Sequence, residues 1–240
     1  MKHIVLFSGG SASSYLAYMI SQKEKKEDII LLHTPTFSEH PDADRFRRQV
    51  SDYVGLPITE AADGRDLWKL IDDNHCLPSQ FIPFCTRKLK QEPAMKFYKS
   101  LSEDFIIYVG YGRKEWRRVQ KQSSRFESMG LKSDYPLFYN NIDDQVIKDT
   151  IKNEWGICLP ITYLYLNHNN CLPCFKGGKS HFYKIWEHFP EYFQKAVKKE
   201  EEIGHTVFKD FSLKQLAKSW EENKQLTFLE DDNLPCLCSI

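Results

Sequence analysis

The chain has 240 residues, with 33 basic and 33 acidic residues and a formal net charge of zero. Its apolar runs are much shorter than the roughly 18 residues of a membrane span, and the balanced charge argues against a general attraction to nucleic acid or anionic lipid. The first apolar run is too short for a secretory signal, so the seven cysteines are expected in a cytoplasmic protein, as thiols or metal ligands rather than disulfides.

The first 140 residues alternate between buried-strand patterns and helical patterns. Strands are predicted at residues 3–7, 28–33, 56–60 and 104–110. Helices are predicted at residues 13–20 and just after Pro41. Such alternation is typical of a parallel sheet with helices on its faces. Residues 1–140 are therefore predicted to form a Rossmann-like α/β core, with its ligand beyond the carboxyl ends of the strands.

The remainder of the chain lacks strong strand patterns. Helical patterns are found at residues 143–155, 181–188, 190–204 and 212–222. They surround a loop that contains cysteines, so residues 141–226 are predicted to form a helical region. The last residues, 227–240, are predicted to form a tail.

The stretch "FSGGSASS" follows the first predicted strand and opens the first predicted helix. A turn in this place offers free backbone N–H groups and the positive end of a helix dipole, which together favour an anion. It lacks the glycines of a dinucleotide-binding turn and the Gly-Lys-Ser/Thr ending of a P-loop. The competing interpretation is an ordinary turn with a serine cap. The candidate contacts to this anion, which the resemblance described below implies is a nucleotide, are Ser8, Gly9, Gly10, Ser11, Ser13, Ser14 and, after the second strand, Thr34.

Two further patterns suggest ligand binding. Arg113, Arg117, Lys121 and Arg125 recur every four residues, which would place them on one helix face, as phosphate contacts or as an ordinary solvated surface. The pair Cys171-x-x-Cys174 has the spacing of metal or cluster ligands.

Several motifs resemble the PP-loop ATPases, and in particular their phosphoadenosine phosphosulfate (PAPS) reductase-like branch. "SGGSASS" is similar to the SGGxDS pyrophosphate loop, with Ala12 where that loop usually has aspartate. "CTRKLKQEP" at 85–93 and "YVGYGRKEWRR" at 108–118 resemble two further motifs of the branch. "YPLF" at 135–138 and "NNCLPCFKGGK" at 169–179 follow in the same order. The resemblance spans nearly the whole chain and includes the ATP pyrophosphatases of DNA phosphorothioation.

The resemblance implies roles for several of these residues. It gives Lys90, Arg113 and Arg117 catalytic contacts to phosphate. It adds Cys85 to Cys171 and Cys174 as ligands of a [4Fe–4S] cluster, with zinc or a relay of reduced thiols as alternatives. The fourth ligand would be Cys76, Cys158, Cys236 or Cys238. The two tail cysteines, Cys236 and Cys238, are also candidate reactive thiols.

The implied activity is an ATP pyrophosphatase that uses ATP and Mg²⁺ to adenylate a substrate oxygen before sulfur insertion. The expected partners are a cysteine desulfurase as sulfur donor and DNA along the basic residues 113–125. One alternative is a PAPS or adenylylsulfate reductase, which would need a nucleophilic tail cysteine. Another is a nucleotide-binding subunit without catalysis, because Ala12 replaces the aspartate.

Overall fold

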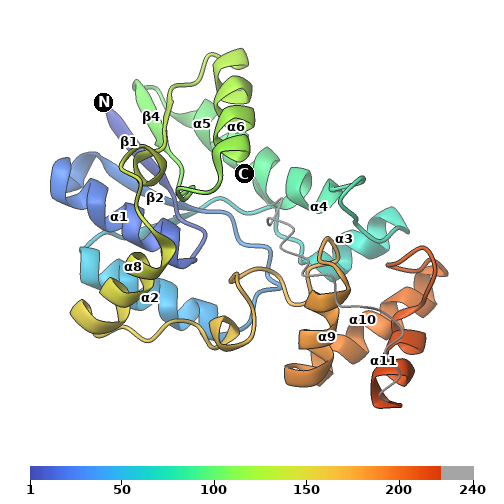
Figure 1. The fold of residues 1–240 in the computed structure, drawn as a ribbon. Helices are drawn as coiled ribbons and strands as arrows, with labels where there is room; N and C mark the ends of the chain where they lie inside the picture. The colour runs from blue at the N-terminus through green and yellow to red at the C-terminus, as the bar shows by residue number, and fades with distance from the viewer. Residues whose placement is uncertain (223–240) are drawn as a thin grey trace.

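The computed structural model describes residues 1–222 and contains one parallel sheet of five strands (Figure 1). The strands are β1 (Lys2–Leu6), β2 (Ile29–His33), β3 (Ile58–Glu60), β4 (Phe105–Tyr108) and β5 (Ser133–Asp134). Their order across the sheet is β3-β2-β1-β4-β5. The order therefore reverses between β1 and β4, and in open parallel sheets ligands bind at this switch point, beyond the carboxyl ends of the strands.

Helices cover both faces of the sheet, as the alternating pattern predicted. Val5 and Phe7 of the first strand segment pack with α1 (Ser11–Lys23), α2 (Asp42–Val54) and α8 (Asp144–Asp149). Ile4 and Leu6 point to the other face and pack with α5 (Glu92–Ser100) and α6 (Trp116–Ser128). The predicted Rossmann-like α/β class, with a helical C-terminal region, is confirmed.

A second apolar core lies beside the sheet layers, on the right in Figure 1. It contains the helices α3 (Leu67–Asn74), α4 (Phe84–Thr86), α9 (Lys179–His188), α10 (Pro190–Ile203) and α11 (Leu213–Glu221). The turns and short helices between the main elements are η1 (Lys26–Asp28), η2 (Arg87–Gln91), α7 (Pro136–Tyr139), η3 (Thr150–Glu154) and η4 (Ile161–Leu164).

The two cores do not follow the boundary predicted at residue 141. Residues of α3 and α4, from the first half of the chain, pack with the C-terminal helices. Ile147, Ile151 and Trp155, from the second half, pack on α1 and the sheet. The reason is that apolar faces pair in space rather than in chain order.

Among the described residues, no helix is both long and apolar enough to cross a membrane.

Candidate functional site

The turn between β1 and α1 has the backbone geometry that the glycines predicted. Gly9 has a φ of +78°, in the left-handed region that favours glycine. Gly10 caps α1, which begins at Ser11. The turn lies beyond the carboxyl end of β1, the central strand of the sheet. Its backbone therefore lies where a parallel sheet of this order binds ligands.

The serines of the turn divide into two groups. The hydroxyls of Ser13 and Ser14 donate to the carbonyl oxygen of Gly10, at 3.0 and 2.9 Å. Ser14 is fully buried, and its hydroxyl is engaged at the start of the helix. Ser8 is exposed, and its hydroxyl lies 3.2 Å from that of Ser13. Ser8 is therefore the serine that solvent reaches most directly.

A buried arginine lies against the turn. Arg47 of α2 is only 6% exposed, and its Cγ would lie 2.6 Å from a Cβ placed on Gly9. One guanidinium nitrogen, Nη2, donates to Asp44, whereas the buried Nη1 has no hydrogen-bond partner among residues 1–222. A buried donor without an acceptor costs about 1–3 kcal/mol. Arg47 thus places a buried, positively charged donor beside the glycine turn.

His33, the last residue of β2, lies beside Arg47 and is also buried. Its Nδ1 lies 2.9 Å from the carbonyl oxygen of Phe7, so Nδ1 carries the proton and donates. Nε2 is then a hydrogen-bond acceptor, and it has no partner in the part of the chain that the structure describes. Burial, followed by the charge of Arg47, lowers the pKa of His33 from 6.5 to about 4. His33 is therefore neutral at physiological pH.

The segment after β2 runs from this turn toward the cysteines. Thr34 and Thr36 are buried, and Phe37 has a φ of +50°, which is strained for a bulky residue. The N–H of Leu172 donates to the carbonyl oxygen of Ser38 at 2.8 Å. This backbone contact joins the predicted nucleotide site to the predicted cysteine site.

Glu39 gives the same segment a negative charge. Its carboxylate accepts hydrogen bonds from the Thr36 hydroxyl at 2.7 Å and from the N–H of Ser38 at 3.3 Å. Burial opposes ionisation, but the Thr36 hydrogen bond and the positive charges of Lys90 and Arg47 outweigh it and hold the pKa of Glu39 below its usual range. Lys90 and Arg47 are thus placed around one carboxylate, which keeps three charged side chains at the site.

Two side chains from the C-terminal half hold the glycine turn. The N–H of Ser11 donates to the hydroxyl of Tyr163 at 3.0 Å, and Asn169 donates to the carbonyl oxygen of Gly9 at 2.9 Å. The Thr162 hydroxyl in turn donates to Asn169 at 3.1 Å. The Tyr163 hydroxyl therefore lies on a helix N–H that a phosphate oxygen would otherwise use.

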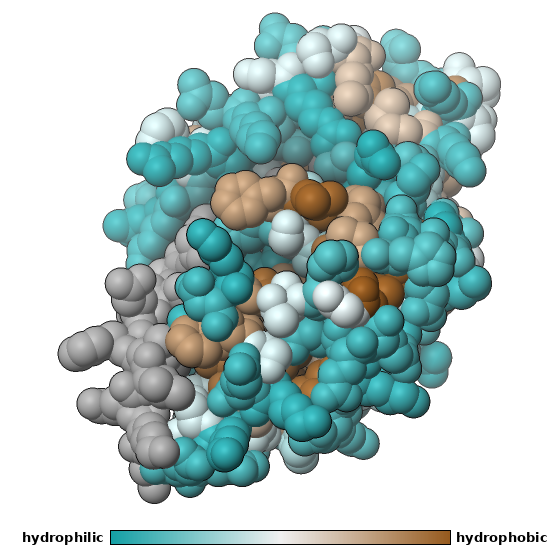
Figure 2. All heavy atoms as spheres, turned by 90° about the vertical axis from the view of Figure 1, so that its right-hand side faces the viewer, coloured by the Kyte–Doolittle hydropathy of each residue, from teal (hydrophilic) through white to brown (hydrophobic). Residues whose placement is uncertain are grey.

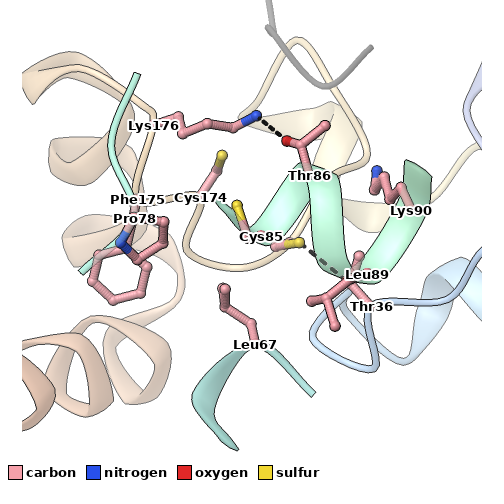
Figure 3. A pocket seen from close by; sticks show the side chains of 11 residues that line it. Thr36, Leu67, Pro78, Cys85, Thr86, Leu89, Lys90, Cys174, Phe175 and Lys176 are labelled. Atoms are coloured by element: carbon pink, nitrogen blue, oxygen red, sulfur yellow. Dashed lines mark hydrogen bonds between the residues drawn. The ribbon is translucent and has the colours of Figure 1, made fainter. Parts of the chain in front are cut away.

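The structure brings the three predicted ligand cysteines to one pocket (Figure 3). Cys85 and Cys174 point into the same space, and the Sγ of Cys171 lies 3.1 Å from the Thr36 hydroxyl. Within residues 1–222, no group of three histidine, cysteine or acidic side chains is arranged to hold a metal ion. Three thiols are the donor set of a cluster, but their arrangement is not a ligand cage. The cluster stays a prediction.

Lysines line the same pocket. Lys90 of η2 is one of them, and Lys176 is another, buried and with its Nζ 2.8 Å from the Thr86 hydroxyl. Lys176 lies in the motif at 169–179, but nothing in that motif indicated that this lysine would line the pocket. The face on the right of Figure 1 is mostly polar, with apolar side chains grouped around a hollow near its centre (Figure 2).

His181 positions the cysteine loop. Its Nε2 accepts the N–H of Cys174 at 3.1 Å, which requires Nε2 to be unprotonated. Burial, followed by the charges of His168 and Lys184, lowers the pKa of His181 from 6.5 to about 4.

We expect this histidine to make the protein less stable in mild acid. Between pH 6.5 and 4 the unfolded chain binds a proton at His181 and the folded chain does not, so stability falls as the pH falls. The loss from pH 7 to pH 5 is about 2 kcal/mol. His181→Gln keeps an acceptor for Cys174 and removes the titration, so its urea midpoint should fall less over this range. The exposed His205→Gln is the control; equal slopes in all three proteins would contradict the assignment.

The basic residues do not form one continuous helix face. The chain turns at Arg113 and Lys114, and α6 begins only at Trp116. Arg113 therefore lies in the preceding turn rather than on the helix. Arg125 donates to the Gln91 side chain at 2.7 Å. Arg113, Arg117 and Lys121 are exposed. Cys236 and Cys238 lie outside the described residues.

Comparisons with known proteins find a relative that matches part of the chain and a solved structure of low sequence identity. No family model matches the chain. An uncharacterized nin region protein, ORF290, of Escherichia phage lambda is 28% identical over 123 residues, which is 40% of this chain and 42% of that protein. The chain thus matches less than half of that relative. A crystal structure of PAPS reductase from Candida auris, in a phosphate complex, has 19% identity and a TM-score of 0.47, over 68% of this chain and 75% of that one.

Proposed function

We propose that the carboxyl edge of the sheet binds ATP and that the protein cleaves it between the α- and β-phosphates. The observation that carries this proposal is the unpartnered, buried Nη1 of Arg47 beside Gly9. A phosphate oxygen would satisfy that donor, and the positive end of α1 favours the same anion although Tyr163 occupies the N–H of Ser11. Lys90, held near Glu39, supplies a second positive charge.

In the proposed reaction, an oxygen of the substrate attacks the α-phosphorus of ATP. The bond between that phosphorus and the bridging oxygen to the β-phosphate breaks, and pyrophosphate leaves into the glycine turn with the electron pair. The outer sulfur of a persulfide on the donor then attacks the substrate phosphorus and AMP leaves with the electron pair. A thiol reductant cleaves the resulting S–S bond, which leaves the sulfur on the substrate and a disulfide on the donor side. DNA is the first candidate substrate, as in phosphorothioation, and a cysteine desulfurase is the candidate donor.

The residues at the turn offer a poor site for a protein-held Mg²⁺. Ala12 provides no carboxylate, and both oxygens of Glu39 already accept hydrogen bonds. Magnesium would be bound mainly by phosphate oxygens and water. The charge that the protein itself brings to the leaving pyrophosphate comes from Arg47, Lys90 and the backbone of the turn.

The cysteine pocket is the proposed route for sulfur. Cys85, Cys171 and Cys174 line it together, and Thr36 joins it to the segment after β2. Metal analysis of anaerobically purified protein separates the options. Iron and a brown colour would support the cluster, stoichiometric zinc without iron would replace it with a structural ion, and metal-free protein would leave a thiol relay.

The products of the reaction test the proposed activity. With ATP, Mg²⁺, a DNA acceptor and a desulfurase with cysteine, we expect AMP and pyrophosphate in equal amounts. With PAPS and reduced thioredoxin we expect little sulfite. Abundant thioredoxin-dependent sulfite that is abolished by Cys236→Ser or Cys238→Ser would identify a reductase instead.

A further inference from the structure

An exposed tryptophan lies at the start of α6. Trp116 is 54% exposed, although burying such a large aromatic side chain is strongly favourable. The guanidinium carbon of Arg117 lies 5.3 Å from the centre of its ring. The ring is therefore held beside a cation and open to solvent.

Positive charges surround this tryptophan. Together with it, the exposed residues Arg113, Lys114, Arg117 and Lys121 form what we name the α6 basic surface. The acidic residue within this stretch, Glu115, accepts hydrogen bonds from Arg118 and from the N–H of Gly112. Asp144 of α8 faces Gly112 at the inner end of the stretch. Glu115 is thus engaged in hydrogen bonds, and the exposed cations of residues 113–121 form a positive surface.

The α6 basic surface is continuous with the candidate nucleotide site. It follows β4, whose carboxyl end lies next to that of β1. At Gly110 the chain passes so close to the glycine turn that an added Cβ would lie 3.1 Å from the backbone nitrogen of Ser13. A polymer bound along α6 can therefore reach the turn where the phosphates of ATP are proposed to bind.

We propose that the α6 basic surface binds single-stranded nucleic acid, with an unpaired base stacked on Trp116 and the flanking phosphates on Arg113, Arg117 and Lys121. This inference rests on the proposed function and specifies that the nucleic-acid substrate is bound as a single strand. An aromatic ring among cations is the arrangement by which proteins bind single strands without sequence preference.

The exposed ring is the reason for choosing a single strand over a duplex. Lysines and arginines alone would bind either, because both carry the same phosphate charge. In a duplex the base faces are already stacked on one another, so Trp116 could gain a stacking partner only from a strand whose bases are unpaired.

Fluorescence anisotropy with a labelled 12-nucleotide oligothymidylate and a labelled hairpin duplex tests this proposal. We expect the single strand to bind at least about tenfold more tightly than the duplex, and Trp116→Ala to weaken single-strand binding by about tenfold or more. Trp116→Phe should retain most of the affinity. Phe81→Ala is the matched control, because Phe81 is 95% exposed and lies on another segment; it should bind as the wild type does.

Preference for the duplex, no binding of either probe, or an equal loss in Phe81→Ala would overturn the inference. ATP affinity, measured on the same proteins by calorimetry, separates this failure from that of the proposed function. Wild-type protein and Trp116→Ala should bind ATP equally. If ATP binds and the oligonucleotide does not, only the single-strand surface is wrong; if wild-type protein fails to bind ATP, the proposed function is wrong.

Discussion

Replacing Gly9 with valine is expected to abolish detectable ATP binding. The residue has a φ of +78°, which costs a β-branched side chain about 1–3 kcal/mol. A Cβ would also lie 2.6 Å from the Cγ of Arg47 and 3.1 Å from its unpartnered Nη1. The substitution therefore distorts the turn and displaces the buried cation at once, and we expect a loss of at least about a hundredfold in affinity by calorimetry.

Gly130→Val is the matched control for this variant. Gly130 has a φ of +70°, and no atom of the described residues lies within 4 Å of a Cβ added there. It should lose similar backbone stability yet bind ATP normally. Normal ATP affinity in a folded Gly9→Val protein would show that phosphates do not approach this turn.

Replacing Arg47 with methionine should separate binding from stability. The charged hydrogen bonds of a guanidinium to phosphate contribute about 1.5–3 kcal/mol, so ATP affinity should fall between about tenfold and a hundredfold. In the absence of nucleotide the stability should change less than the binding does, because the removal of a buried donor without a partner offsets the loss of the positive charge beside buried Glu39. Urea unfolding and calorimetry on the same preparation measure both quantities.

Arg47→Lys completes this comparison. A lysine keeps the charge but not the two-pronged geometry, so its affinity should lie between those of the wild type and Arg47→Met. A strongly destabilised Arg47→Met protein with unchanged ATP affinity would make Arg47 a structural residue of α2 and remove the main support for the anion site.

The sequence predicted the parts of this site that are formed by residues adjacent in the chain. A buried strand, two glycines and a helix start are neighbours in the chain, so their arrangement follows from backbone chemistry. The same reasoning could not decide which serine hydroxyls face solvent. Ser14 looked equivalent to Ser8, yet its position one turn into α1 buries it and directs its hydroxyl to Gly10.

The contacts that complete the site come from distant segments and gave no local signal. Arg47 lies in the helix predicted after Pro41, but its burial comes from packing against Gly9, which is far from it in the chain. Tyr163 reaches Ser11 across 152 positions in the chain. Likewise, the apolar face of α3 packs with the C-terminal helices. The sequence alone does not show which segment that face contacts.

Competition calorimetry tests the central claim, that the turn beside Arg47 holds the outer phosphates of ATP, most directly. ATP would be titrated into the wild-type protein alone, with saturating pyrophosphate, and with saturating AMP. We predict that pyrophosphate suppresses ATP binding strongly and that AMP suppresses it much less, because the turn and Arg47 contact the phosphates that AMP lacks. Strong competition by AMP with no effect of pyrophosphate would contradict the claim.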